Sequence, residues 1–226
     1  MPRRPRTATG GYVYHVINRA VRRTTLFRKQ ADYAAFEAAL GEAHDFQPMR
    51  LLSYCLMPNY WHLVLWPHDD GDLSTYMRWL TGTHSQRYHT LNRTAGTGPV
   101  YAGRFKSFPV QPGESLGGVC RYVERDPVRA GLVLKAAAWR WSSLYRQAQG
   151  ISTPWLSNWP RGRPELAAWL KEVNRAETGA ELAAVIRAID RGSPYGSEAW
   201  RKRTVERLGL ESTLRPRGRP VKLKLD

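Results

Sequence analysis

The sequence predicts an α+β fold, in which one antiparallel sheet carries helices, from three observations. Strand-like and helix-like stretches follow one another in the order strand, helix, strand, strand, helix, strand, helix. The second and third strand-like stretches are separated only by Pro58-Asn59, which is typical of a tight turn. After about residue 150 the composition changes, and helix-like segments follow a stretch rich in Pro, Trp and Ser. Together these features favour a ferredoxin-like sheet domain followed by a helical C-terminal extension.

Strands are expected where β-branched and aromatic residues gather between turn-forming residues. The first such stretch follows Gly10-Gly11, and the second and third flank the Pro58-Asn59 turn. The four expected strands cover residues 12–18, 49–57, 60–66 and 100–110. Because side chains alternate along a strand, residues 60 and 62 are expected on one face of the sheet.

Helices are expected where apolar residues recur at intervals of three and four. Tyr33, Phe36, Leu40 and Ala43 show this spacing in the first of them. The expected helices of the sheet domain cover residues 31–46, 73–91 and 115–125. The third is expected to stop at Pro127, because a residue that precedes proline avoids the helical conformation.

The C-terminal part is expected to form short helices. Pro164 at a first-turn position opens one, Thr178 and Glu181 form a capping-box pattern for the next, and a third ends at Gly209. The residues expected to face inward on the first two are Leu166, Trp169, Leu170, Val173, Leu182, Val185, Ile186 and Ile189. The predicted organisation is a basic arm (1–10), a sheet domain (11–146), a linker that packs by its tryptophans (147–163), a helical extension (164–210) and a basic tail (211–226).

The charge of the chain indicates an anionic partner. The 226 residues carry a net charge of +16, and 28 of the 35 basic residues are arginines. Arginine matches phosphate geometry with two donors, so nucleic acid is favoured over the rival partners, an acidic protein or a lipid surface. Two cysteines exclude a disulfide framework and a zinc cluster. No apolar run approaches the ~20 residues of a membrane span and no signal peptide is visible, so a cytoplasmic protein is expected.

Two places combine side chains that could carry chemistry. Tyr60 and His62 put a phenol and an imidazole on one strand face, although a lone strand histidine is more often structural. Tyr122 and Asp126 are four residues apart and share a helix face if the helix reaches that far. The alternative is that Asp126 begins a turn at Pro127 and pairs with Arg129.

Five blocks of the sequence, taken in order, resemble a known family. They are Tyr-His-Val-Ile-Asn-Arg at 14–19, Met-Pro-Asn-x-x-His-Leu at 57–63, Gly-Arg-Phe-Lys-Ser at 103–107, Arg-Tyr-Val-Glu-x-x-Pro-Val-Arg-Ala-Gly-Leu at 121–132, and Trp-Arg-Trp-Ser-Ser at 139–143. This pattern is similar to the REP-associated tyrosine transposases, which belong to the single-tyrosine HUH transposases of the insertion-sequence-200 type. The resemblance covers about residues 11–146 and implies the HUH version of the ferredoxin-like fold.

The resemblance assigns roles to four residues. It implies that Tyr122 is the nucleophile, which attacks single-stranded DNA to give a 5′-phosphotyrosine and a free 3′-OH. It implies a divalent metal, Mg²⁺ or Mn²⁺, held by two histidines and a polar residue one helical turn after the tyrosine. His62 takes the second histidine position and Asp126 the polar position, whereas Tyr60 stands where the family has its first histidine. Phenol is a weaker ligand than imidazole, so either Asp126 compensates or cleavage has been lost. His15, on the first strand, is a further candidate to assist.

The DNA contacts are expected among the basic residues around these positions. They are Arg19, Arg22 and Arg23 after the first strand, and Arg104, Lys106, Arg121, Arg125 and Arg129 beside the proposed site. Tyr101, Phe105 and Trp141 offer stacking faces, but core packing is favoured for each.

The leading hypothesis for function is a transposase-like enzyme that nicks and rejoins hairpin-forming single-stranded DNA, acting as a monomer or homodimer. The second is a catalytically weakened or inactive DNA-binding regulator on the same fold. The third is a protein that binds RNA hairpins, because a ferredoxin-like sheet with basic and aromatic residues also suits RNA.

Overall fold

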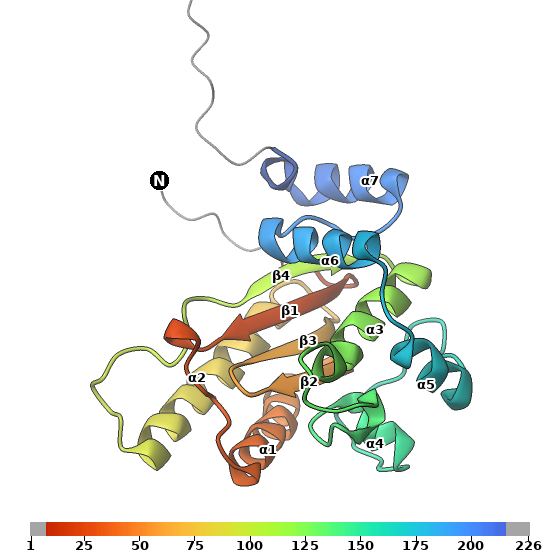
Figure 1. The fold of residues 1–226 in the computed structure, drawn as a ribbon. Helices are drawn as coiled ribbons and strands as arrows, with labels where there is room; N and C mark the ends of the chain where they lie inside the picture. Colours follow the sequence, from red (N-terminus) through yellow and green to blue (C-terminus); the bar gives the residue numbers. More distant parts are fainter. Residues whose placement is uncertain (1–7, 216–226) are drawn as a thin grey trace, which may run out of the picture.

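The computed structural model describes residues 8–215 and has a four-stranded antiparallel sheet at its centre (Figure 1). The strands are β1 (Val13–Arg19), β2 (Arg50–Met57), β3 (Tyr60–Trp66) and β4 (Lys106–Val110), in the spatial order β2-β3-β1-β4. The sheet and its helices confirm the predicted α+β, ferredoxin-like class. None of the helices among residues 8–215 is long and apolar enough to cross a bilayer.

The hairpin of β2 and β3 forms where the sequence predicts it, with Pro58-Asn59 as its turn. Both strands are buried along almost their whole length, because helices cover both faces of the sheet. β1 lies between β3 and β4 and pairs antiparallel with each. This register fixes which side chains share a face, and it therefore determines the geometry of the candidate site.

One face of the sheet is covered by α1 (Gln30–Phe46) and α2 (Asp72–Asn92) (Figure 1). Their apolar residues, such as Phe36 and Leu80, pack against the strand residues Trp61 and Leu63 in one core cluster. Tyr101, Phe105 and Trp141 belong to the same cluster. Each of these three aromatic side chains is buried, so the favoured interpretation as core residues is confirmed.

The opposite face is covered by α3 (Glu114–Arg129), which runs across β2 and β3. The predicted end of this helix at Pro127 is wrong, because Pro127 lies inside it. The proline removes one backbone donor close to the helix end, and Ala130 N still donates to Asp126 O at 2.8 Å. Asp126 therefore stays helical, one turn after Tyr122.

The fourth strand is shorter than predicted. The expected strand at 100–110 is wrong in its first half, since β4 begins at Lys106 and only an isolated bridge joins Tyr101 to Ala20. The Tyr101 hydroxyl accepts from Trp61 Nε1 at 3.1 Å and bonds to His84 Nδ1 at 2.8 Å, which turns this segment toward the core. Arg104 thus lies on a loop and Lys106 at the start of the strand.

The C-terminal part supplies α5 (Leu166–Asn174), α6 (Gly179–Arg191) and α7 (Glu198–Leu208), after the short α4 (Ser143–Ala148). Short 3₁₀ turns lie at Val21–Arg23, Ala136–Ala138 and Glu211–Thr213. The capping box of Thr178 and Glu181 is confirmed, as is the end of α7 at Gly209. α5 and α6 pack on α3, and α6 also lies against β4 (Figure 1).

Two details of these helices differ from the prediction. Pro164 does not open a helix, because α5 is capped by Glu165, whose carboxylate accepts from the backbone N–H groups of Ala167 and Ala168. Leu166 and Ile186 are exposed rather than inward-facing, since each helix buries only a narrow stripe that includes Trp169 and Val185.

The segment predicted as a linker is held by its tryptophans, as expected. Trp159 is buried and donates from Nε1 to Leu52 O at 3.1 Å, and Leu156 forms a parallel bridge to Leu51 beside the edge strand β2. The predicted division into domains stays a prediction. Most of the predicted arm, and residues 216–226 of the predicted tail, lie outside the described residues.

Candidate active site

The candidate site lies on the face of the sheet that α3 covers. Antiparallel pairing sets Ile17 opposite His62 and Arg19 opposite Tyr60, so these side chains project from the same face. His15 is two residues before Ile17 and shares that face. The alternation predicted for Tyr60 and His62 therefore holds, with the phenol and the imidazole on the side of α3.

Two imidazoles and a carboxylate form a chain across this face. His15 Nε2 is 2.9 Å from His62 Nδ1, and His62 Nε2 is 3.3 Å from Asp126 Oδ2. All three side chains are buried. The structure thus brings together His62 and Asp126, as the sequence predicted, and adds His15 as a direct neighbour of His62.

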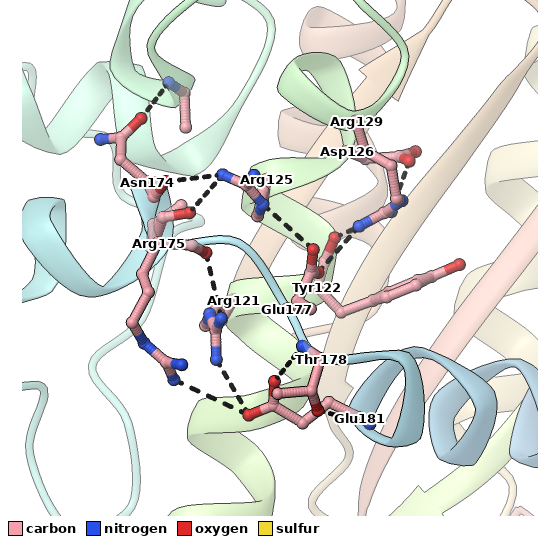
Figure 2. A network of polar contacts seen from close by, with 12 residues as sticks. Arg121, Tyr122, Arg125, Asp126, Arg129, Asn174, Arg175, Glu177, Thr178 and Glu181 are labelled. Carbon is pink, nitrogen blue, oxygen red and sulfur yellow. Dashed lines mark hydrogen bonds and ion pairs between the residues drawn. The ribbon is translucent and has the colours of Figure 1, made fainter.

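Tyr122, on α3, lies over the row formed by His15, His62 and Asp126. Its ring meets the His62 ring edge-on, with centroids 5.7 Å apart, and the His15 ring at 6.4 Å. Tyr60 also meets His62 edge-on, at 5.3 Å. In Figure 2 the Tyr122 side chain extends from α3 beneath the Arg129 guanidinium. The proposed nucleophile and the proposed metal-binding residues therefore occupy one site.

Arg129 contacts both Tyr122 and Asp126. Its guanidinium carbon lies 4.1 Å from the centre of the Tyr122 ring, and Nη2 donates to Asp126 Oδ1 at 2.5 Å and to Tyr122 O at 3.2 Å. Nη1 donates to Glu177 Oε1 at 2.9 Å (Figure 2). The pairing of Asp126 with Arg129 that the sequence left open is present, without a turn at Pro127.

Burial and charge set the protonation states of the site. Burial and the nearby His62 hold the pKa of His15 well below its usual range, so His15 is neutral. Burial would raise the pKa of Asp126, but His62 and Arg129 outweigh it and keep that pKa below its usual value. Burial and then the Asp126 charge raise the pKa of Tyr60, so this phenol stays protonated. Burial also raises the pKa of Tyr122, against the opposing effect of Arg129.

Three arginines that the sequence placed among the DNA contacts are instead bound by carboxylates of the C-terminal part (Figure 2). Arg121 is buried between Glu172 and Glu181, with Nη1–Oε1 distances of 3.1 and 3.2 Å. Glu177 binds both Arg125, at 3.0 Å, and Arg129, at 2.9 Å. These guanidinium groups hold α3 to the C-terminal helices, and their predicted contact with DNA stays a prediction.

The other predicted DNA contacts are open to solvent. Arg19, Arg22, Arg23 and Arg104 are exposed, and Lys106 forms only a surface ion pair with Asp190 at 3.0 Å. Arg19, Arg104 and Lys106 line a hollow of about 410 Å³ that also includes Ile17. Because Ile17 pairs with His62 and Arg19 with Tyr60, this basic hollow adjoins the site.

Sequence reasoning missed Glu177 and understated Arg129 and His15. Glu177 carried no signal, since a single glutamate between two short helices has no distinctive pattern. The sequence placed His15 on the first strand, but its contact with His62 follows from the pairing of β1 with β3, which the spacing within one strand does not predict.

The residues present do not fit a divalent metal. Among residues 8–215, no group of three or more His, Cys, Asp or Glu side chains is placed to hold a metal ion. Tyr60 offers a neutral phenol where the family has a histidine. The Asp126 carboxylate already forms an ion pair with the Arg129 guanidinium. Asp126 Oδ2 accepts no hydrogen bond from a described residue. This oxygen and His62 Nε2, which are 3.3 Å apart, are the two atoms at the described site that remain as candidate metal ligands, and two ligands are fewer than the family's three.

Comparison with known proteins identifies the family. The model of the family described as IS200-like transposases matches residues 8–126, which is more than half of the chain. This chain belongs to the IS200-like transposase family. The matched segment of this IS200-like transposase contains His15, Tyr60, His62 and Tyr122 and ends at Asp126. The resemblance predicted from the five sequence blocks is confirmed at the level of the family.

One solved structure shows the fold of this chain, and a second is similar over a smaller part of it. A REP-associated tyrosine transposase bound to a REP hairpin is 18% identical, with a TM-score of 0.54, and the alignment covers 73% of this chain and 98% of that one. A putative transposase from Deinococcus radiodurans R1 is 16% identical, with a TM-score of 0.39, over 54% of this chain and 96% of that one. No curated protein matches the chain.

Proposed function

We propose that this IS200-like transposase binds hairpin-forming single-stranded DNA and cuts and rejoins one strand through a phosphotyrosine at Tyr122. The observation that carries the proposal is the position of Tyr122, whose ring lies against His62 and His15 beside a basic hollow. A nucleophile, polar groups and cations for a phosphate thus adjoin one another on one sheet face.

The reaction conserves the phosphodiester energy. The Tyr122 oxygen forms a bond to phosphorus as the bond from phosphorus to the 3′ oxygen breaks. The phenol loses a proton and the departing 3′ oxygen takes one up, so no oxidant or reductant is consumed. Burial keeps the Tyr122 phenol protonated at neutral pH, so the incoming phosphate must be positioned before the proton leaves. The covalent intermediate can then pass its DNA to a second 3′-OH.

The path of the DNA is supported by the cations that the fold leaves exposed. Arg19 and Arg104 line the hollow next to His62 and Tyr60, and no described residue forms an ion pair with either of them. Arg22 and Arg23 extend this charge beyond the end of β1. Guanidinium groups in such a row suit successive phosphates. The similar REP-associated transposase is bound to a hairpin, which supports hairpin DNA as the ligand here.

A second candidate function is a DNA-binding regulator that does not cut. The ion pairs of the site favour it, because Asp126 and Glu177 bind the charges of Arg125 and Arg129 beside Tyr122. A phosphate at Tyr122 would meet a site whose charges are already paired. Detection of a covalent protein–DNA product on a denaturing gel separates the two functions.

The predicted DNA surface can be tested by salt dependence. Replacing Arg19 and Arg104 with glutamine should flatten the slope of log K against log salt by ~1.4 to ~1.8, since each lost phosphate contact removes ~0.7 on single strands and ~0.9 on duplex. A labelled hairpin titrated by fluorescence anisotropy at several salt concentrations measures the slope. The matched control replaces Arg187 and Arg203, which are exposed on α6 and α7, and should keep the parent slope. Equal slopes in all three proteins would place the DNA elsewhere.

A further inference from the structure

We infer that the cation of this tyrosine site is the Arg129 guanidinium, and that the site has no functional divalent metal. The inference rests on the proposed role of Tyr122 for its meaning in catalysis, but its main claim concerns metal binding and is measured without DNA. It departs from what the family resemblance implies, and the departure comes from the donor set of this chain.

The first observation is the position of Arg129. Its guanidinium stacks over the Tyr122 ring at 4.1 Å and binds Asp126 Oδ1 at 2.5 Å. An amide at position 126 would offer no charge to attract this guanidinium, whereas the Asp126 carboxylate does. A divalent ion bound to Asp126 would lie within a few ångströms of Arg129, in a buried place where like charges repel strongly. The positive charge at the nucleophile is therefore already present in the chain.

The second observation is the tautomer of His62. His15 Nδ1 is buried without a hydrogen-bond partner. If His62 Nδ1 donated to His15 Nε2, the His15 ring would carry its proton on Nδ1 as a buried donor without a partner. If His15 Nε2 donates instead, Nδ1 carries only a lone pair, and His62 presents its Nε2 proton to Asp126 Oδ2 at 3.3 Å. The second arrangement leaves no N–H aimed at an apolar surrounding, because the His62 Nε2 proton faces the carboxylate. In it, a metal at His62 Nε2 would have to displace a proton that faces Asp126.

The third observation is Tyr60. Its ring packs edge-on against His62, with centroids 5.3 Å apart, at the position where the family has a histidine. A neutral phenol is a poor ligand beside imidazole. Tyr60 thus supplies no imidazole, His62 Nε2 faces the Asp126 carboxylate, and that carboxylate is already bound by Arg129. Position 60 therefore lacks the imidazole that the family has, and the carboxylate at position 126 is occupied by Arg129.

The test is Mn²⁺ binding to the full-length protein, followed by the loss of the free-ion signal in electron paramagnetic resonance. The parent should leave that signal unchanged. The double variant Tyr60→His with Asp126→Asn removes the carboxylate that holds Arg129 and supplies an imidazole. It should bind Mn²⁺ at least about 10-fold more tightly than the parent. Adding His62→Ala to the double variant should abolish this binding, which locates it.

Two results of the Mn²⁺ titration would overturn the inference. One is Mn²⁺ binding by the parent that disappears in His62→Ala. The other is a folded double variant, judged by circular dichroism, that binds no more Mn²⁺ than the parent. If the parent forms a Tyr122–DNA adduct, its rate should be the same with and without a chelator, and a dependence on metal would also contradict the inference. If no adduct forms at all, the proposed cleavage fails while the Mn²⁺ titration still decides the question of the metal.

Discussion

Replacing Tyr122 with phenylalanine should lower formation of the covalent protein–DNA adduct by at least about 10³-fold, because the substitution removes the attacking oxygen. The ring contacts with His62 and Arg129 remain possible, so the fold and hairpin binding should persist. The measurement is a labelled single-stranded hairpin incubated with each protein and resolved on a denaturing gel.

Tyr195→Phe is the matched control. Tyr195 lines the same pocket beside α3 as Tyr122, but it belongs to the segment after α6 that pairs with β4. It loses one hydroxyl like the test variant and should form adduct at the parent rate. An adduct that persists in Tyr122→Phe and disappears in Tyr195→Phe would move the nucleophile to the other side of the pocket.

Replacing Glu124 with alanine should lower the free energy of unfolding by about 3–5 kcal/mol, because it leaves a buried charge without its partner. The Glu124 side chain is fully buried. It accepts hydrogen bonds from Ser53, Ser143 and Trp169 Nε1, at 2.9, 2.7 and 2.7 Å. It also binds Arg163. These partners come from β2, α4, α5 and the segment before α5, so Glu124 ties the C-terminal part to the sheet.

Urea unfolding followed by tryptophan fluorescence measures this loss. Glu42→Ala is the control, because Glu42 forms an ion pair with Arg87 in which both side chains are more than two-fifths exposed. Exposed pairs contribute little, so this variant should lose at most about 1 kcal/mol. Equal losses in the two variants would show that the buried network around Glu124 does not hold the C-terminal helices in place.

The order of strands and helices could be predicted because hydrophobic periodicity and turn residues act locally. The hairpin around Pro58-Asn59 and the capping box at Thr178 follow from neighbouring residues alone. The end of α3 could not be predicted in this way. Proline disfavours a helix locally, but Asp126 and Arg129 stabilise the last turn through contacts with Glu177 and the sheet.

The residues of the site were predicted better than their partners. Tyr122, His62 and Asp126 meet as expected, because strand alternation and helical spacing each fix a face. Whether an arginine of α3 is paired within the protein depends on which carboxylates the C-terminal part places beside α3. Arg121 binds Glu172 and Glu181, and Arg125 binds Glu177, so each partner is 51 or more residues away in the sequence. A count of basic residues cannot distinguish a guanidinium bound inside the protein from one available to DNA.

The central claim, that Tyr122 becomes joined to DNA, is tested most directly by mapping the adduct with mass spectrometry. Trypsin cuts after Arg121 and Arg125, so the nucleophile would lie in the short peptide 122–125. After the bound DNA is trimmed with nuclease, this peptide should carry the added mass of a 5′-phosphate nucleotide on Tyr122. The same added mass on a peptide that contains Tyr60 or Tyr195, or a hairpin complex that yields no modified peptide, would contradict the account.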